Sequence, residues 1–120
     1  MKMIAVKLQG VEVQAALLSP DVMKRVEDGF DKAIKTIETE GKKENVSGSA
    51  SVRKQCQAVI DYVTDIFGAD AARKIFGGET DYLTCLDVLE EIQCMYPEQV
   101  SPIIRQKNEA LKALMKKSEE

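Results

Sequence analysis

Two aspartates four residues apart, Asp61 and Asp65, are the first candidates for chemistry in this 120-residue chain. A carboxylate pair can work as general acid and base when one member is buried in a cleft and its pKa is shifted. Both aspartates fall on the polar face of a predicted helix, with Lys and Arg nearby in the sequence. The chain also has no histidine, the most common general base. We therefore expect no catalytic site and a protein that is not an enzyme.

Signals for a metal or cofactor are equally weak. Cys56, Cys85 and Cys94 lack CxxC spacing, and each falls within a helical pattern. This favours free, mostly buried thiols over disulfides or zinc ligands, with Cys94 partly exposed. Gly77 and Gly78 open the segment GGET, but neither GxxxxGK[ST] nor GxGxxG occurs. The sequence predicts no metal and no cofactor.

Composition limits the partners. Hydrophobic residues make up 44% and charged residues 31%, as in an ordinary globular domain, and the net charge is −3. An acidic chain has no general attraction to nucleic acid or to anionic lipid. No window approaches the roughly 20 apolar residues of a membrane span, and the start MKMIAVKLQG is too short and charged for a signal peptide. We expect a cytoplasmic protein with no nucleic-acid or membrane partner.

The first 17 residues predict a β-hairpin. Apolar residues alternate at Ile4, Val6 and Leu8, and the alternation resumes after Gln9-Gly10. Period-2 patterns on both sides of a Gly-containing turn are typical of a hairpin. Two strands alone are marginal in water, so the hairpin must pack on the helices or pair with another chain through an edge.

A helix is predicted over residues 20–39, with Ser19 as its cap and Pro20 in its first turn. Gly29 inside it costs about 1 kcal/mol relative to Ala, and close packing against a neighbouring helix would explain its presence. Residues 40–51, rich in Gly, Ser and charge, are predicted to form a flexible loop.

Residues 52–96 are predicted to form the helical core. Two glycines, Gly68 and Gly77, are expected to end the helices that carry Phe67 and Phe76. The next helix is expected to begin at Asp81 or Thr84, and Thr84 with Asp87 fits a capping box. Its expected core stripe includes Leu83.

A C-terminal helix is predicted over residues 98–117, because Pro97 is expected to end the preceding one. Its apolar positions recur at helical spacing, although Lys107 interrupts them. This helix is expected either to cover the core or to pair with another subunit. The predicted fold is a single domain, mainly α (α+β), with an N-terminal β-hairpin followed by a bundle of about four to five helices.

The runs QCQAVIDYVTDIFG, KIFG and ETDYLTCLDVLEEI, after a hairpin and a helix opening at Ser19-Pro20, resemble small phage and prophage proteins of the tail-morphogenesis region. The resemblance spans roughly Ile4 to Met95 and is strongest over residues 55–92. In size, order of elements and the Phe-Gly steps the chain is similar to phage tail assembly chaperones. The resemblance implies an assembly factor in the host bacterial cytoplasm that binds the tape-measure protein or other tail proteins.

Such a chaperone needs an exposed apolar face for its client and often associates with itself. The candidate partner-binding residues lie on the last helix: Ile103, Ile104, Leu111 and Leu114. The hairpin edge is a second candidate, and either surface would support a homo-oligomer. The alternatives are a structural phage protein, such as a small tail or head–tail connector component, and a small regulatory DNA-binding domain. The acidic pI and the lack of a basic recognition helix argue against DNA binding.

Overall fold

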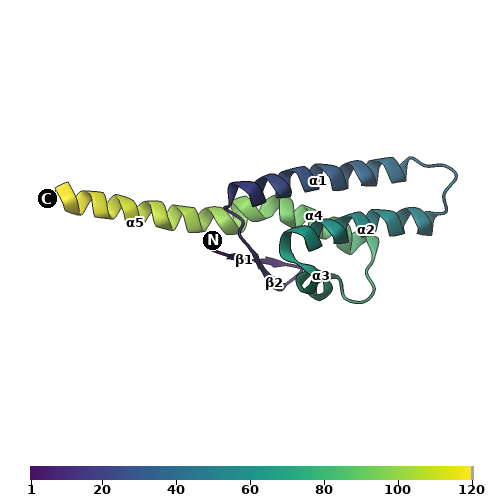
Figure 1. Ribbon diagram of the computed structural model, residues 1–120, viewed down its shortest axis with the longest axis horizontal. Coiled ribbons are helices and arrows are strands. Elements are labelled where there is room, and N and C mark those ends of the chain that lie inside the picture. Colours follow the sequence, from purple (N-terminus) through teal and green to yellow (C-terminus); the bar gives the residue numbers. More distant parts are fainter. Residues whose placement is uncertain (120) are drawn as a thin grey trace.

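The computed structural model describes residues 1–119, which form an elongated molecule with extents of 72 × 25 × 21 Å (Figure 1). A two-stranded antiparallel sheet precedes a series of helices, as the sequence predicts. The elements are β1 (Ile4–Leu8), β2 (Val11–Ala15), α1 (Pro20–Gly41), α2 (Gly48–Phe67), α3 (Ala69–Phe76), α4 (Tyr82–Met95), the π-helical turn η1 (Tyr96–Val100) and α5 (Ser101–Glu119).

The hairpin is confirmed, with Val6 opposite Val13 and a two-residue turn at Gln9-Gly10. Both turn residues have positive φ, 51° for Gln9 and 73° for Gly10, as the tight turns preferred by hairpins require. The apolar face of β1 is buried against the helices. The hairpin therefore belongs to the core of the domain.

Helices α1 and α2 pack closely at Gly29. A Cβ atom at this position would lie 2.6 Å from two atoms of the Tyr62 ring. The Tyr62 hydroxyl donates a hydrogen bond of 2.7 Å to the carbonyl oxygen of Val26, one turn earlier on α1. This confirms that close helix packing explains the glycine within α1.

The connection between these helices is shorter than the predicted loop of residues 40–51. Helix α1 continues to Gly41 and α2 already begins at Gly48. The Ser47 hydroxyl caps α2 by accepting a hydrogen bond from the Ala50 amide at 3.2 Å. A single hydroxyl thus starts a helix within a Gly- and Ser-rich segment. At the start of α1, by contrast, Ser19 occupies the cap position but its side chain makes no capping hydrogen bond.

The two glycine helix ends are confirmed. Gly68 ends α2 with φ of 95°, and Gly77 ends α3 with φ of 70°. A residue with a side chain rarely adopts this left-handed backbone, whereas Gly does so without strain. The two ends place Phe76 in the core and leave Phe67 half-buried against it.

Helix α4 is capped by Asp81, so the predicted Thr84–Asp87 capping box is wrong. The Asp81 carboxylate accepts hydrogen bonds of 2.8 Å from both the amide and the hydroxyl of Thr84. These bonds lower the pKa of Asp81, because they favour its charged form. Leu83, expected in the core, is 67% exposed, and Cys85 occupies the inner face instead.

Pro97 does not end the helix, contrary to expectation. Tyr96 keeps helical angles (φ −63°, ψ −55°), and the chain passes through Pro97 in η1, where the Ser101 amide donates to the Tyr96 carbonyl. In an α-helix the proline ring would clash with a carbonyl one turn earlier, and a π-helical turn changes that spacing. Contacts with the rest of the domain fix this turn, since the Tyr96 hydroxyl donates to the Leu17 carbonyl at 2.8 Å.

Candidate protein-binding surface

Helix α5 projects from the domain along its long axis (Figure 1). Its close contacts with other elements are chiefly with η1, which precedes it in the chain. Every residue from Ile103 to Ser118 is exposed. Of the two roles expected for this helix, covering the core is therefore excluded for Ile103 to Ser118, and their apolar side chains face solvent.

The apolar residues of α5 lie on one side of the helix. From the buried residue Val100, steps of four, three, four and three residues lead to Ile104, Lys107, Leu111 and Leu114, and this spacing keeps the side chains on one face. The face contains all four residues predicted to bind a partner, and Met115 extends it. We call these residues the α5 stripe: Ile103 (39% exposed), Ile104 (38%), Leu111 (58%), Leu114 (62%) and Met115 (64%).

Charge is distributed unevenly along the molecule. Helix α5 (Ser101–Glu119) carries five basic side chains and two acidic ones, although the whole chain has a net charge of −3. The basic residues flank or interrupt the stripe and are Arg105, Lys107, Lys112, Lys116 and Lys117. The net charge of the whole chain does not reveal this basic, projecting helix, because the rest of the chain is acidic.

A groove lies beside the base of α5, between α1 and the α4–η1 helix, with a volume of about 650 Å³. Among the described residues that line it, the charged ones are both acidic, Glu27 and Asp31. We call it the α1–α4 groove. Its lining is Leu18, Met23, Val26, Glu27, Phe30, Asp31, Tyr62, Ile92, Gln93, Tyr96, Val100, Ser101 and Ile104. The sequence did not reveal it because its walls come from segments far apart in the chain.

Side chains of α4 and η1 bind part of the outer edge of β1 and the turn that follows it. The Lys7 amide donates to Gln99 Oε1 at 2.7 Å, and Gln99 Nε2 donates to the Lys7 carbonyl at 3.1 Å. The amide of Gln9 donates to Glu91 Oε2 at 2.7 Å. These bonds occupy the outward-facing backbone groups of Lys7, so another strand could pair with β1 at this point only by displacing them.

The two aspartates considered for catalysis have separate partners. Asp61 accepts a hydrogen bond of 2.8 Å from Gln57 Nε2, whereas Asp65 pairs with Arg25 at 3.0 Å. Both residues are exposed, and each carboxylate is bound to a neighbour on the helix surface. The structure does not bring them together around a reacting group.

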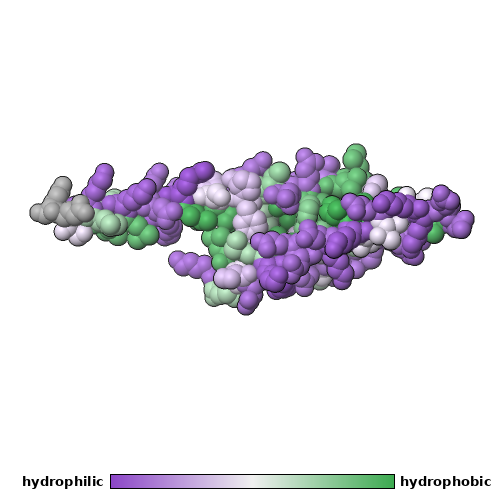
Figure 2. Space-filling view, turned by 90° about the horizontal axis from the view of Figure 1, so that it is seen from above, coloured by the Kyte–Doolittle hydropathy of each residue, from purple (hydrophilic) through white to green (hydrophobic). Residues whose placement is uncertain are grey.

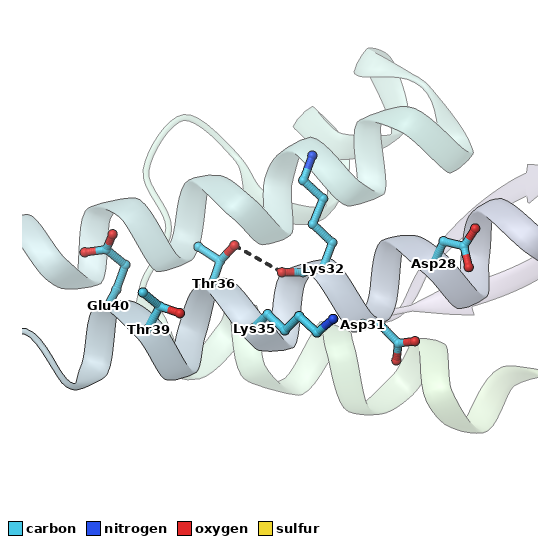
Figure 3. A pocket seen from close by; sticks show the side chains of 7 residues that line it. All are labelled: Asp28, Asp31, Lys32, Lys35, Thr36, Thr39 and Glu40. Atoms are coloured by element: carbon cyan, nitrogen blue, oxygen red, sulfur yellow. Dashed lines mark hydrogen bonds between the residues drawn. The ribbon is translucent and has the colours of Figure 1, made fainter.

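A second hollow, of about 510 Å³, lies along α1 and is lined by a single helix. Figure 3 shows its side chains spread over the helix surface, with one hydrogen bond between them, from Thr36 Oγ1 to the Lys32 carbonyl at 3.0 Å. The residues are Asp28, Asp31, Lys32, Lys35, Thr36, Thr39 and Glu40. Three carboxylates and two lysines are spread along this face of α1, so the hollow has no convergent set of ligating groups.

All three cysteines are free, as predicted, with Cys56 and Cys85 buried and Cys94 partly exposed. Burial, together with the neighbouring Cys56 thiol, raises the pKa of Cys85 to about 12. The thiolate is the reactive form of cysteine, so the raised pKa makes Cys85 less reactive than an ordinary thiol.

We expect native protein treated with iodoacetamide at pH 8 to be alkylated first at Cys94. Cys56 and Cys85 should react at a comparable rate only in denaturant, which removes their burial. Peptide mass spectrometry over a time course measures the three rates separately. Equal rates at Cys85 and Cys94 in native protein would contradict the packing described for α4.

Within residues 1–119, no group of three His, Cys, Asp or Glu side chains is placed to hold a metal ion. The same part of the chain contains no helix long and apolar enough to cross a membrane.

Comparison with known families gives one match. A family of unknown function, DUF6673, matches residues 9–119. The match covers nearly the whole chain, including α5, and the chain therefore belongs to this family. Neither the curated proteins nor the solved structures compared with it include a match.

Proposed function

We propose that this protein is a non-enzymatic assembly factor that binds another protein through α5. The supporting observation is the α5 stripe, whose side chains are 38 to 64% exposed on a projecting helix. The resemblance of residues 55–92 to phage tail assembly chaperones suggests the tape-measure protein as the client and the cytoplasm of a bacterial host as the place of action.

The physical argument rests on the cost of exposed apolar surface. Burial of a Leu, Ile or Met side chain contributes about 1.5–3 kcal/mol, so the five apolar side chains of the stripe form a strong binding surface even with Lys107 among them. The row extends over about 18 Å from Ile103 to Met115, at 1.5 Å per residue. That length and shape suit an amphipathic helix laid alongside it.

The proposal is tested by co-expression with the tape-measure protein of the same genome. We expect the two to co-purify, and we expect Leu111→Glu/Leu114→Glu to abolish capture. Gln106→Glu/Ala113→Glu, on the opposite face of α5 with the same change of charge, should retain it. Capture that survives the stripe variant would refute α5 as the client surface.

A second measurement, the protein content of purified particles, distinguishes an assembly factor from a structural component of the particle. An assembly factor is expected to be absent from purified particles. Stoichiometric presence in mature particles would instead favour a small tail or head–tail connector component.

The basic side chains of α5 favour nucleic-acid binding as a second candidate function. Helix α5 carries five Lys and Arg side chains against two acidic ones. Contacts of this kind to phosphates weaken steeply with salt. A mobility-shift assay with random duplex DNA at 50 mM salt tests it, and the absence of a shifted band at micromolar protein would dismiss it.

A further inference from the structure

The α5 stripe and the α1–α4 groove meet at Ile104. This residue is 38% exposed on the stripe, and it also lines the groove beside Val100 and Ser101. Figure 2 shows hydrophobic surface along one side of the projecting helix and again where the helix joins the body. The stripe is thus an outward continuation of the groove wall, and the two surfaces face solvent next to each other.

The charges of the two surfaces are complementary. The charged residues described in the groove are Glu27 and Asp31, both acidic, and the stripe is flanked by basic side chains. Lys107 lies between Ile104 and Leu111 on the apolar face, where it would weaken a purely apolar contact. Opposite a groove with two carboxylates, the same lysine gains a partner and adds specificity.

We propose that the α5 stripe of one copy binds in the α1–α4 groove of a second copy, and that the α5 stripe of the second copy binds in the α1–α4 groove of the first. The result is a dimer with an isologous interface, in which each chain supplies one helix and one groove. The dimer buries the α5 stripe, so a client would bind the stripe only by displacing the second copy. The inference otherwise concerns the chain alone and does not depend on the proposed client.

The dimensions permit this arrangement. Helix α5 is about 28 Å long and α1 about 33 Å, and α1 begins near the point where α5 leaves the body (Figure 1). A two-fold axis near Ile104 lays the partner helix along α1. On that helix Leu111 lies about 10 Å beyond Ile104, and on α1 Phe30 lies about 10 Å beyond Met23, so the two rows of apolar side chains have matching lengths.

The stability of α5 also favours a second copy. An isolated helix of this length is marginal in water, because most helical stability in proteins comes from tertiary packing. Stable interfaces bury about 1,200–2,000 Å² in total, more than a single helix face readily provides. The reciprocal arrangement doubles the contact and covers both exposed helices at once.

The mass of the full-length protein tests the proposal, measured by sedimentation equilibrium from 1 to 100 µM. We expect a dimer, with twice the 13.3 kDa mass of the chain. The stripe variant Leu111→Glu/Leu114→Glu should dissociate at least 100-fold more readily, with an unchanged circular dichroism spectrum. The opposite-face variant Gln106→Glu/Ala113→Glu should remain a dimer. A monomeric wild type at 100 µM, or a stripe variant that still dimerises, would overturn the inference.

Charge exchange tests the groove as the receiving surface. Lys107→Glu alone, or Glu27→Lys/Asp31→Lys alone, should weaken the dimer about tenfold, because each places like charges opposite one another. The triple combination should regain affinity. If the loss of dimer affinity in the combined variant equals the sum of the losses in the two separate variants, α5 does not bind this groove.

The outcomes also separate this inference from the proposed function. A monomer that captures the tape-measure protein would reject the dimer and leave the client-binding role intact. A dimer with the variant behaviour described, but without capture, would support the dimer and reject the client.

Discussion

Replacing Gly29 with alanine is expected to lower the free energy of unfolding by about 1–3 kcal/mol, the usual cost of overpacking a core. The added Cβ would lie 2.6 Å from two Tyr62 ring atoms, closer than real contacts allow, so either the ring or α1 must move. Movement of the ring also strains the hydrogen bond from Tyr62 to the Val26 carbonyl. The better helix propensity of Ala, worth about 1 kcal/mol, offsets only part of this cost.

Urea denaturation followed by circular dichroism measures the effect, and two variants make the result specific. Gly41→Ala, where nothing lies within 4 Å of the new atom, should change stability by less than about 0.5 kcal/mol. In a Tyr62→Leu background, which removes the ring, the Gly29→Ala penalty should disappear. A penalty that persists there would place its cause within α1 itself.

Local patterns determine much of this fold. Alternation at Ile4, Val6 and Leu8 predicts the hairpin, because one face of a strand must be buried. Glycines at positions 68 and 77 predict helix ends, because their left-handed backbone is a local requirement. The interior glycine of α1 points correctly to a close helix contact, although the sequence cannot name its partner, Tyr62.

The errors arise where distant contacts override local preference. Pro97 is a helix breaker by its own chemistry, yet Gln99 binds the edge of β1 and Tyr96 binds the Leu17 carbonyl. These bonds connect residues 79 and 92 positions apart, and no local pattern contains them. The continuous helix that they support carries α5 away from the body.

For the candidate site too, local spacing predicts one part and distant contacts determine the rest. Helical spacing identifies Ile103, Ile104, Leu111 and Leu114 as one face, but it does not say whether that face is buried. The direction of η1 decides this, and the direction depends on packing against β1 and the end of β2. The α1–α4 groove could not be found from the sequence at all, because Phe30 and Tyr96 are brought together only by the fold.

The π-helical turn connects the domain to its exposed helix without a loop. Val100 is 1% exposed and belongs to the core, whereas Ile103, three residues later, is 39% exposed. The helix thus crosses from the interior to solvent within one turn, without a loop. A helix held in this way presents its apolar side in a fixed direction, which reduces the conformational entropy lost when a partner binds.

Ending the chain after Gln106 is therefore expected to remove all association while leaving the body folded. The removed residues that the structure describes are exposed and contribute nothing to the buried core. Compared with the full-length Leu111→Glu/Leu114→Glu variant, which serves as the monomeric reference, the shortened chain should differ by less than about 0.5 kcal/mol in free energy of unfolding. The reference matters because dimerisation itself would stabilise the wild type through mass action.

Three measurements on the shortened chain check this expectation. Its helical circular dichroism signal should fall in proportion to the residues lost, its sedimentation should be that of a monomer, and the tape-measure protein should no longer co-purify with it. Loss of cooperative unfolding would mean that α5 supports the core after all. If the shortened chain still dimerises or still captures the client, the binding surface lies on the body of the domain, because no part of the stripe beyond Ile104 remains.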